Sequence, residues 1–137
     1  MTSDFRKVEM IKILVVDDER EILDEIAEAL TDEGYEAVCA DRVDAALEIL
    51  RNQPDIGMVV TDLKMPGKTG VDLINEARAE FERDIAFIVM SGSPDNFGLD
   101  LKEFPVLRKP LDIDKFLEAV QTALSLKGAQ DRNRRPE

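Results

Sequence analysis

Histidine and tryptophan are absent from this chain of 137 residues. Without histidine, Ser-His-Asp and Cys-His catalytic sites are excluded, as are most zinc sites and any role as a phosphohistidine carrier. The single cysteine, Cys39, cannot close an intramolecular disulfide bond, and because it lies in an apolar run we expect it to be an inert core thiol. If phosphoryl or metal chemistry takes place here, carboxylates must carry it.

Positive charge is also scarce, since 18 Lys and Arg residues stand against 30 Asp and Glu residues and the formal net charge is −12. Such a chain lacks the basic surface that direct nucleic-acid binding requires. Long apolar runs are missing as well: the longest has about half a dozen residues, far fewer than the ~20 that span a bilayer. We therefore expect no nucleic-acid contact, no membrane span and a cytoplasmic location.

The apolar residues that are present, 44% of the chain, suffice for the core of one domain. Several short runs are rich in Ile and Val, which is typical of strands buried on both faces in a parallel sheet. The strongest runs are residues 11–16, 56–60 and 85–90, and two weaker ones are residues 36–40 and 106–107.

Segments with helical periodicity separate these runs. They cover about residues 22–30, with Gly34 as a C-terminal stop, then 43–52, 71–81 and 112–128, the last starting at Asp112 as N-cap. The alternation predicts an α/β domain with helices on both faces of a parallel sheet. Five units are too few for an eight-stranded barrel, so we favour a doubly wound, flavodoxin-like sheet with strand order 2-1-3-4-5.

The region between the fourth and fifth strands fits this pattern less well. Residues 93–98 are turn-forming, and only 99–104 could be helical, so a short or irregular fourth helix is predicted. The domain itself should cover residues 10–127, with an N-terminal extension at 1–9 and a polar tail or linker at 128–137.

Polar residues follow four of the five predicted strands. Asp17 and Asp18 follow the first strand, Asp62 the third, Ser91 the fourth and Lys109 the fifth. Ligands of open α/β sheets bind at the carboxyl ends of the strands, where the strand order reverses. Capping, turn formation or solvation could explain each residue alone, but their coincidence favours one shared site.

Three carboxylates in one pocket need cations, because two anions ~4 Å apart repel by ~4 kcal/mol at an effective dielectric constant of 20. Lys109 supplies one positive charge, and Mg²⁺ is the natural divalent ion for a shell of carboxylate, carbonyl and water oxygens. A metal ion, a lysine and an aspartate together can receive a phosphoryl group.

These residues resemble the receiver domain (CheY-like) of two-component response regulators. The resemblance covers about residues 10–126. It is carried by ILVVDDE at 13–19, VTDLKMPG at 60–67 with Gly70, MSG at 90–92 and KP at 109–110. It implies a signalling domain, rather than an enzyme, that phosphorylates and dephosphorylates itself and switches conformation to regulate a downstream protein.

The resemblance implies that Asp62 accepts a phosphoryl group from the phosphohistidine of a sensor histidine kinase or a histidine phosphotransfer protein. The lack of histidine agrees with a donor in trans. The implied cofactor is Mg²⁺, bound by Asp18, Asp62 and the backbone carbonyl of Lys64, with Asp17 acting through a metal-bound water.

By the same resemblance, Ser91 is the switch hydroxyl that moves to the phosphoryl oxygen and Lys109 is its ion-pair partner. The peptide bond before Pro110 is expected to be cis. Ile22, on the first helix beside the acidic pocket, is a candidate for docking the phosphodonor protein, although its helical position suits the core equally well.

Two departures from the family pattern concern the output side. Receivers usually carry Tyr or Phe three residues before the lysine; here Val106 stands there, and the nearest aromatic residue is Phe104. About four residues are also missing between Ser91 and Lys109. Both changes lie on the usual output and dimerisation surface, so the resemblance does not extend to the usual output mechanism; we expect a monomer or weak dimer.

Three other classes of protein share some of these features. Aspartyl-phosphate phosphatases usually present two aspartates separated by one residue, whereas Asp17 and Asp18 are adjacent. A flavin carrier needs hydroxyls and glycine after the first strand, where these aspartates would repel a phosphate. The alternative that stays open is a pseudo-receiver, acting as a phosphorylation-independent protein interaction module.

Overall fold

The architecture is a five-stranded parallel sheet between two layers of helices, seen in a computed structural model that describes residues 10–92 and 104–134, with side chains as far as residue 127. The strands are β1 (Lys12–Val16), β2 (Glu36–Ala40), β3 (Met58–Asp62), β4 (Ala86–Ser91) and β5 (Val106–Arg108). The helices in these ranges are α1 (Arg20–Asp32), α2 (Val43–Asn52), α3 (Gly70–Glu80) and α4 (Ile113–Arg134).

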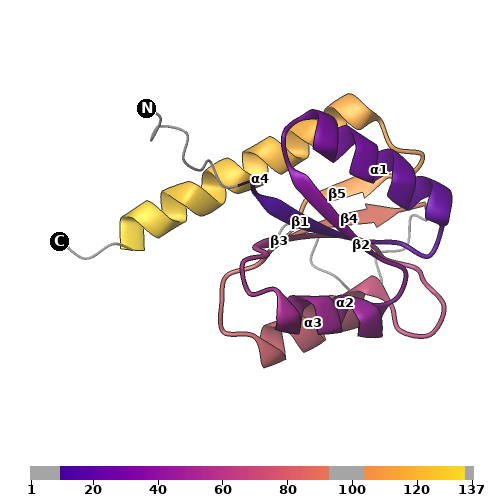
Figure 1. The fold of residues 1–137 in the computed structure, drawn as a ribbon, viewed down its shortest axis with the longest axis horizontal. Helices are drawn as coiled ribbons and strands as arrows, with labels where there is room; N and C mark the ends of the chain where they lie inside the picture. The colour runs from indigo at the N-terminus through magenta and orange to yellow at the C-terminus, as the bar shows by residue number, and fades with distance from the viewer. Residues whose placement is uncertain (1–9, 93–103, 135–137) are drawn as a thin grey trace, which may run out of the picture.

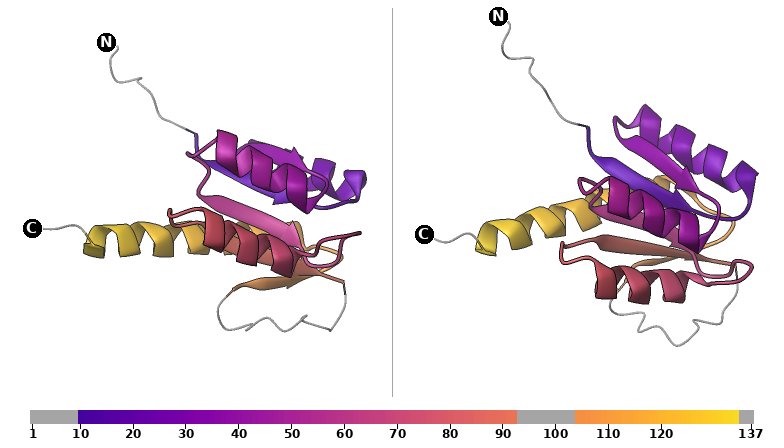
Figure 2. Two further views of the ribbon diagram at one scale, coloured as in Figure 1. Left: turned by 90° about the horizontal axis from the view of Figure 1, so that it is seen from below. Right: turned by 60° about the horizontal axis from the view of Figure 1, so that its bottom comes forward.

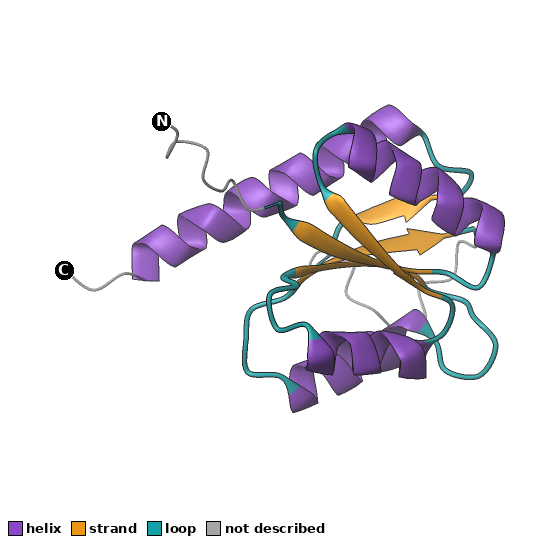
Figure 3. Cartoon of the chain, in the orientation of Figure 1, coloured by secondary structure: helices purple, strands orange, loops and turns teal. Residues whose placement is uncertain are grey.

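The strand order is β2-β1-β3-β4-β5, which confirms the predicted flavodoxin-like topology. Helices α1 and α4 cover one face of the sheet, and α2 and α3 cover the other (Figures 1 and 3). Successive residues of a strand point to opposite faces, so each central strand contributes to both cores. In β1, for example, Leu14 packs toward α2 and α3, whereas Ile13 and Val15 pack toward α1 and α4.

The central strand β3 lies between β1 and β4, and all five of its residues are buried. This explains its nearly continuous apolar sequence, since a strand covered by helices on both faces has no solvent-facing side. β5 is an edge strand of three residues, all of them partly or fully exposed. Polar residues stand at the carboxyl ends of the buried strands, as Asp62 does in β3, and this is where ligands of open α/β sheets bind.

Several predicted helix ends are confirmed. Gly34 follows α1 with a φ of 92°, a left-handed conformation that glycine adopts at no steric cost. Asp112 caps α4, because its Oδ1 accepts a hydrogen bond of 3.2 Å from the backbone N–H of Lys115. The predicted end of α4 at Gly128 is wrong: the helix continues to Arg134 and extends beyond the sheet (Figure 2). A glycine inside a helix costs only ~1 kcal/mol, and good helix formers follow it.

Cys39 is a second correction. It lies in β2 opposite Val15 of β1, yet its side chain is exposed rather than part of the core. The reason is the sheet order, which makes β2 an edge strand and leaves its outer rim uncovered. The thiol is still partly covered by its neighbours; this desolvation raises the pKa of Cys39 and the charge of Asp24 raises it further, so the thiol form is favoured.

Some predictions concern residues outside the described ranges, namely the N-terminal extension at 1–9 and the short fourth helix within 93–104, of which only Phe104 is described. In the part of the chain that the structure covers, no helix has the length and apolar character needed to cross a membrane.

Candidate functional site

The carboxyl edge of the sheet brings the predicted site residues together. Asp17 directly follows β1, Asp62 ends β3, Ser91 ends β4 and Lys109 directly follows β5. The register explains their proximity, because parallel strands that start in register end at the same edge: Asp62 pairs with Met90, one residue before Ser91. The site therefore lies where the strand order reverses, between β1 and β3.

Lys109 occupies the centre of the site. Its Nζ lies 2.8 Å from Asp17 Oδ2, 3.1 Å from Asp62 Oδ2 and 3.6 Å from Glu19 Oε1, and only 15% of its side chain is exposed. The backbone N–H of Lys109 donates to the carbonyl oxygen of Ser91 (2.9 Å), which holds the start of the β5–α4 connection against β4. The peptide bond between Lys109 and Pro110 is cis. One ammonium group thus faces three carboxylates.

Asp17 combines a capping role with a role in the site. Its Oδ1 accepts a hydrogen bond of 2.9 Å from the backbone N–H of Glu19, the residue that precedes α1. Its Oδ2 is fully buried and lies at ion-pair distance from Lys109, but no donor in the described residues reaches it with hydrogen-bond geometry. A buried carboxylate oxygen with spare acceptor capacity suits a further cationic or donor group.

Burial raises the pKa of Asp62, and the negative charge of Asp17 raises it further. The hydrogen bond from Lys109 (3.1 Å) and the backbone N–H of Lys64 act in the opposite direction but do not cancel the increase. Burial alone would lower the pKa of Lys109, yet the carboxylates of Asp17 and Asp62 outweigh burial and raise it. The protein alone therefore leaves an excess of negative charge in the site.

The donor set fits a hard divalent cation. Carboxylate oxygens of Asp17, Asp18 and Asp62 lie within 4.8 Å of one another, and Asp18 is exposed while the other two are buried. Oxygen donors, excess negative charge and the incompletely satisfied Oδ2 of Asp17 together match the requirements of Mg²⁺. The same three residues were singled out by the sequence.

An open cavity of about 630 Å³ lies above these groups. Its lining includes the charged side chains of Asp18, Asp62 and Lys109, together with Lys64, Met65 and Pro66 of the loop after β3. The cavity is large enough for a phosphoryl group together with part of the molecule that delivers it. Glu19 also lines it, a contact that the sequence analysis missed although the residue directly follows the two aspartates.

Two further predicted residues, Ser91 and Ile22, are not among those that line this cavity. The side chain of Ser91 is almost completely buried at the end of β4. Ile22 is half-buried and packs against the core cluster shared by α1 and α4. It does not line the cavity, but its backbone N–H donates to the carbonyl oxygen of Glu19, which does (3.1 Å).

The aromatic side chain nearest to β5, two residues before the strand, is placed differently from the family pattern. Phe104 is buried, with its ring perpendicular to that of Phe87 at a centroid distance of 6.1 Å and with the guanidinium carbon of Arg78 4.9 Å from its ring centre. Val106 is half-buried and packs against the core on the α2–α3 side. The aromatic ring thus belongs to the core, and no aromatic side chain stands at position 106.

The fold and the site together define a class: doubly wound parallel α/β proteins with an acidic, lysine-containing pocket at the switch point of the sheet. Comparison with known proteins then gives the family. The chain belongs to the response regulator receiver domain family, whose model matches residues 13–121. The expected two-component role is thereby supported in general terms.

Solved structures agree with this assignment. The chain is similar to a response regulator receiver domain protein from Clostridium thermocellum (30% identity, 88% of this chain and 99% of that chain covered, TM-score 0.79). It is also similar to a response regulator receiver protein from Pseudomonas putida (32% identity, 85% of this chain and 99% of that chain covered, TM-score 0.73). A CheY-like receiver domain protein from Methanospirillum hungatei matches as well (25% identity, 89% of this chain and 99% of that chain covered, TM-score 0.81).

Proposed function

We propose that this receiver domain accepts a phosphoryl group on Asp62 in a Mg²⁺-dependent reaction and then switches conformation to regulate a partner protein. One observation carries the proposal: a nearly buried aspartate lies in contact with Lys109 and beside two further aspartates, at the floor of an open cavity. Because the phosphoryl group stays on the protein until it is hydrolysed, the domain acts as a signalling element rather than as an enzyme with an external substrate.

The residues would share the work as follows. Asp18, Asp62 and the carbonyl of Lys64 would hold Mg²⁺, and Asp17 would act through a water. When bound, Mg²⁺ offsets negative charge on the phosphoryl oxygens. A carboxylate oxygen of Asp62 attacks phosphorus as the bond to the donor's imidazole nitrogen breaks, and that nitrogen keeps the electron pair. Lys109 binds a phosphoryl oxygen.

Once Asp62 is phosphorylated, the Ser91 side chain would move toward it, and its hydroxyl would donate a hydrogen bond to a second phosphoryl oxygen. Ser91 is buried at the end of β4 and is paired with Arg108 of β5. A movement of Ser91 toward the phosphoryl group would therefore displace β5 as well. This is the route by which we expect phosphorylation to alter the surface near β5. The absence of an aromatic side chain at Val106 means that the altered surface differs from that of receivers that carry one there.

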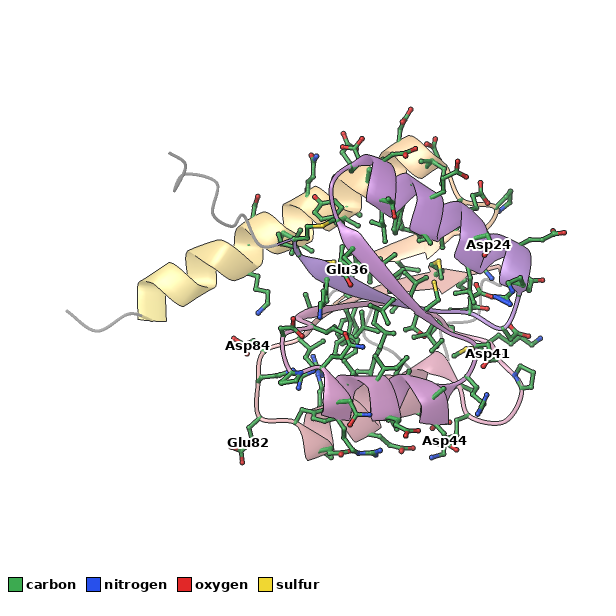
Figure 4. All side chains as sticks on the ribbon, in the orientation of Figure 1. Asp24, Glu36, Asp41, Asp44, Glu82 and Asp84 are labelled. Carbon is green, nitrogen blue, oxygen red and sulfur yellow. The ribbon has the colours of Figure 1, made fainter. Side chains whose placement is uncertain are left out.

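A direct test uses a small-molecule phosphodonor such as acetyl phosphate with Mg²⁺, followed by intact mass measurement. We expect one added phosphoryl group in the wild type, and none in Asp62→Asn or with excess chelator. Asp24→Asn, an exposed aspartate on α1 (Figure 4), is the matched control and should be phosphorylated like the wild type. An equal adduct in Asp62→Asn would contradict the proposal, and no adduct in the wild type would favour the phosphorylation-independent interaction module.

The donor in the cell would be a sensor histidine kinase or a histidine phosphotransfer protein, since the chain has no histidine of its own. We propose that Ile22 contributes to docking this donor. Ile22→Ala should slow transfer from a phosphorylated donor protein at least about threefold while leaving the rate with acetyl phosphate unchanged. Equal slowing with both donors, or loss of the fold, would show that Ile22 is only a core residue. The cytoplasmic location and the monomeric or weakly dimeric state stay predictions.

A further inference from the structure

We infer that Thr61 is a positioning residue for the site: its buried hydroxyl fixes the peptide after Asp62 and thereby the Lys64 carbonyl that is offered to Mg²⁺. The inference rests on the proposed function and adds a residue to which neither the family pattern nor the comparisons assign a role.

Thr61 lies in the central strand β3 and is completely buried. Because side chains alternate along a strand, it points to the same face as Val59, into the apolar layer below α2 and α3. A hydroxyl in such surroundings costs free energy unless it is hydrogen-bonded. Here Thr61 Oγ1 donates to the carbonyl oxygen of Asp62 over 2.9 Å.

The same carbonyl group is confined from a second side by Gly70, the first residue of α3. A Cβ atom on Gly70 would overlap with the Asp62 carbonyl oxygen and would lie 3.0 Å from the Cα of Leu63. The backbone of Leu63 is held as well, since its N–H donates to the Met90 carbonyl (2.9 Å) and its own carbonyl accepts from the Gly70 N–H (2.9 Å). The chain leaving β3 is therefore fixed at consecutive peptide groups.

Two proposed metal ligands flank this fixed stretch. The side chain of Asp62 precedes it, and the carbonyl of Lys64 follows it by one residue. Mg²⁺ demands nearly ideal octahedral geometry with short metal–oxygen distances, so a small tilt of the intervening peptides would spoil both ligands at once. Outer-shell hydrogen bonds of this kind typically change metal affinity by about 10- to 100-fold.

The effect of the Thr61 hydroxyl can be distinguished from that of its methyl group by comparing four proteins: the wild type, Thr61→Ser, Thr61→Val and Thr61→Ala. Serine keeps the hydroxyl, valine keeps the branched shape, and alanine keeps neither. The measurements are the Mg²⁺ dissociation constant by titration calorimetry and, without metal, the amide hydrogen exchange of Leu63 and Gly70 by NMR. Thr31→Val, at an exposed position of α1, is the matched control.

We expect Thr61→Val and Thr61→Ala to bind Mg²⁺ about tenfold more weakly and to exchange the two amide protons faster, while Thr61→Ser and Thr31→Val behave like the wild type. The inference would be wrong if Thr61→Val bound Mg²⁺ like the wild type while Thr61→Ser bound it as weakly as Thr61→Ala, because affinity would then depend on the methyl group. It would also be wrong if the wild type and the three Thr61 variants bound Mg²⁺ equally well. If the wild type itself bound no Mg²⁺, the proposed function would be wrong as well as the inference about Thr61. A failure of the inference alone would leave Mg²⁺ binding by the wild type intact, so the two outcomes can be told apart. If valine prevents folding, the comparison of serine with alanine still decides.

Discussion

At the scale of single residues, the site is organised by unequal numbers of opposite charges. Lys109 is the one cation that the described residues place among Asp17, Glu19 and Asp62, and it lies within 3.6 Å of a carboxylate oxygen of each. The pKa of Asp62 remains raised despite this contact, because burial and the Asp17 charge outweigh it. The metal-free domain is thus destabilised by the group that we propose to be its phosphoryl acceptor.

Replacing Asp62 by Asn should therefore stabilise the metal-free domain at neutral pH, by about 1 kcal/mol, the usual size of a stabilising change in charge. A carboxyl group with a raised pKa in the folded state lowers the free energy of unfolding as pH rises. The loss begins near the pKa of the group in the unfolded chain, ordinarily 3.8, and is complete above its pKa in the folded state. The difference between the variant and the wild type should be small below this window, grow within it and stay constant above it. Urea unfolding in a pH series measures this difference.

Asp24→Asn serves as the exposed control for this experiment and should change the free energy of unfolding by less than about 0.5 kcal/mol at any pH. A variant Asp62→Asn that is less stable than the wild type throughout the pH series would show that the Lys109 ion pair outweighs the burial of Asp62.

At the scale of elements, the connection from β3 to α3 is held by a capping box and by two ion pairs. Thr69 and Asp72 form a capping box at the start of α3, with hydrogen bonds of 3.2 and 2.9 Å. Lys68 bridges Asp44 of α2 and Glu76 of α3, at 3.1 Å from each. Exposed ion pairs add little energy, but together with the cap they keep the loop that carries Lys64 in place.

Gly70 lies directly against the backbone at the end of β3. Gly70→Ala should lower the free energy of unfolding by about 1–3 kcal/mol, because the added methyl group overlaps with the backbone of Asp62, which cannot move without disturbing the sheet. Gly92→Ala is the matched control, since its nearest neighbour would be the Lys109 Cβ at 3.8 Å, an ordinary contact. Denaturant unfolding compares the two variants. Equal losses in the free energy of unfolding would mean that the start of α3 can shift to accommodate the added methyl group.

At the scale of the whole molecule, the charge is strongly negative. Acidic side chains such as Asp24, Asp44 and Glu82 lie on the outside of the body, on both helical layers and on the loop before β4 (Figure 4). With a net charge of −12, the folded state carries a like-charge repulsion that the extended chain can relieve. Salt should therefore matter for the stability of the domain as well as for its site.

Raising NaCl to about 0.5 M should increase the melting temperature by a few degrees, because ions screen charges that lie farther apart than a Debye length. NaCl rather than MgCl₂ is used so that specific binding at the site does not contribute. The increase should shrink near the isoelectric point of about 4.5, where the net repulsion disappears. A melting temperature that falls with salt at neutral pH would mean that attractive ion pairs dominate.

Local pattern was enough to predict the sheet and the composition of the site. Short Ile- and Val-rich runs alternate with periodic helical segments, and the preference for right-handed crossovers leaves few ways to assemble them. Because the strands are parallel, residues that follow them, such as Asp17, Asp62 and Lys109, had to meet at one edge once the order was assumed. The identity of the site residues is therefore a property of the sequence.

Only the tertiary structure decided which strands lie at the edge and how the charges are buried. That Cys39 is exposed, that α4 continues to Arg134 and that the Thr61 hydroxyl bonds to the Asp62 carbonyl could not be read from periodicity. The same holds for the 2.8 Å between Lys109 and Asp17 and for the raised pKa of Asp62. The physical reason is that these quantities depend on neighbours far apart in the chain, whose packing sets distance and dielectric environment, whereas a local pattern specifies only which face a residue occupies.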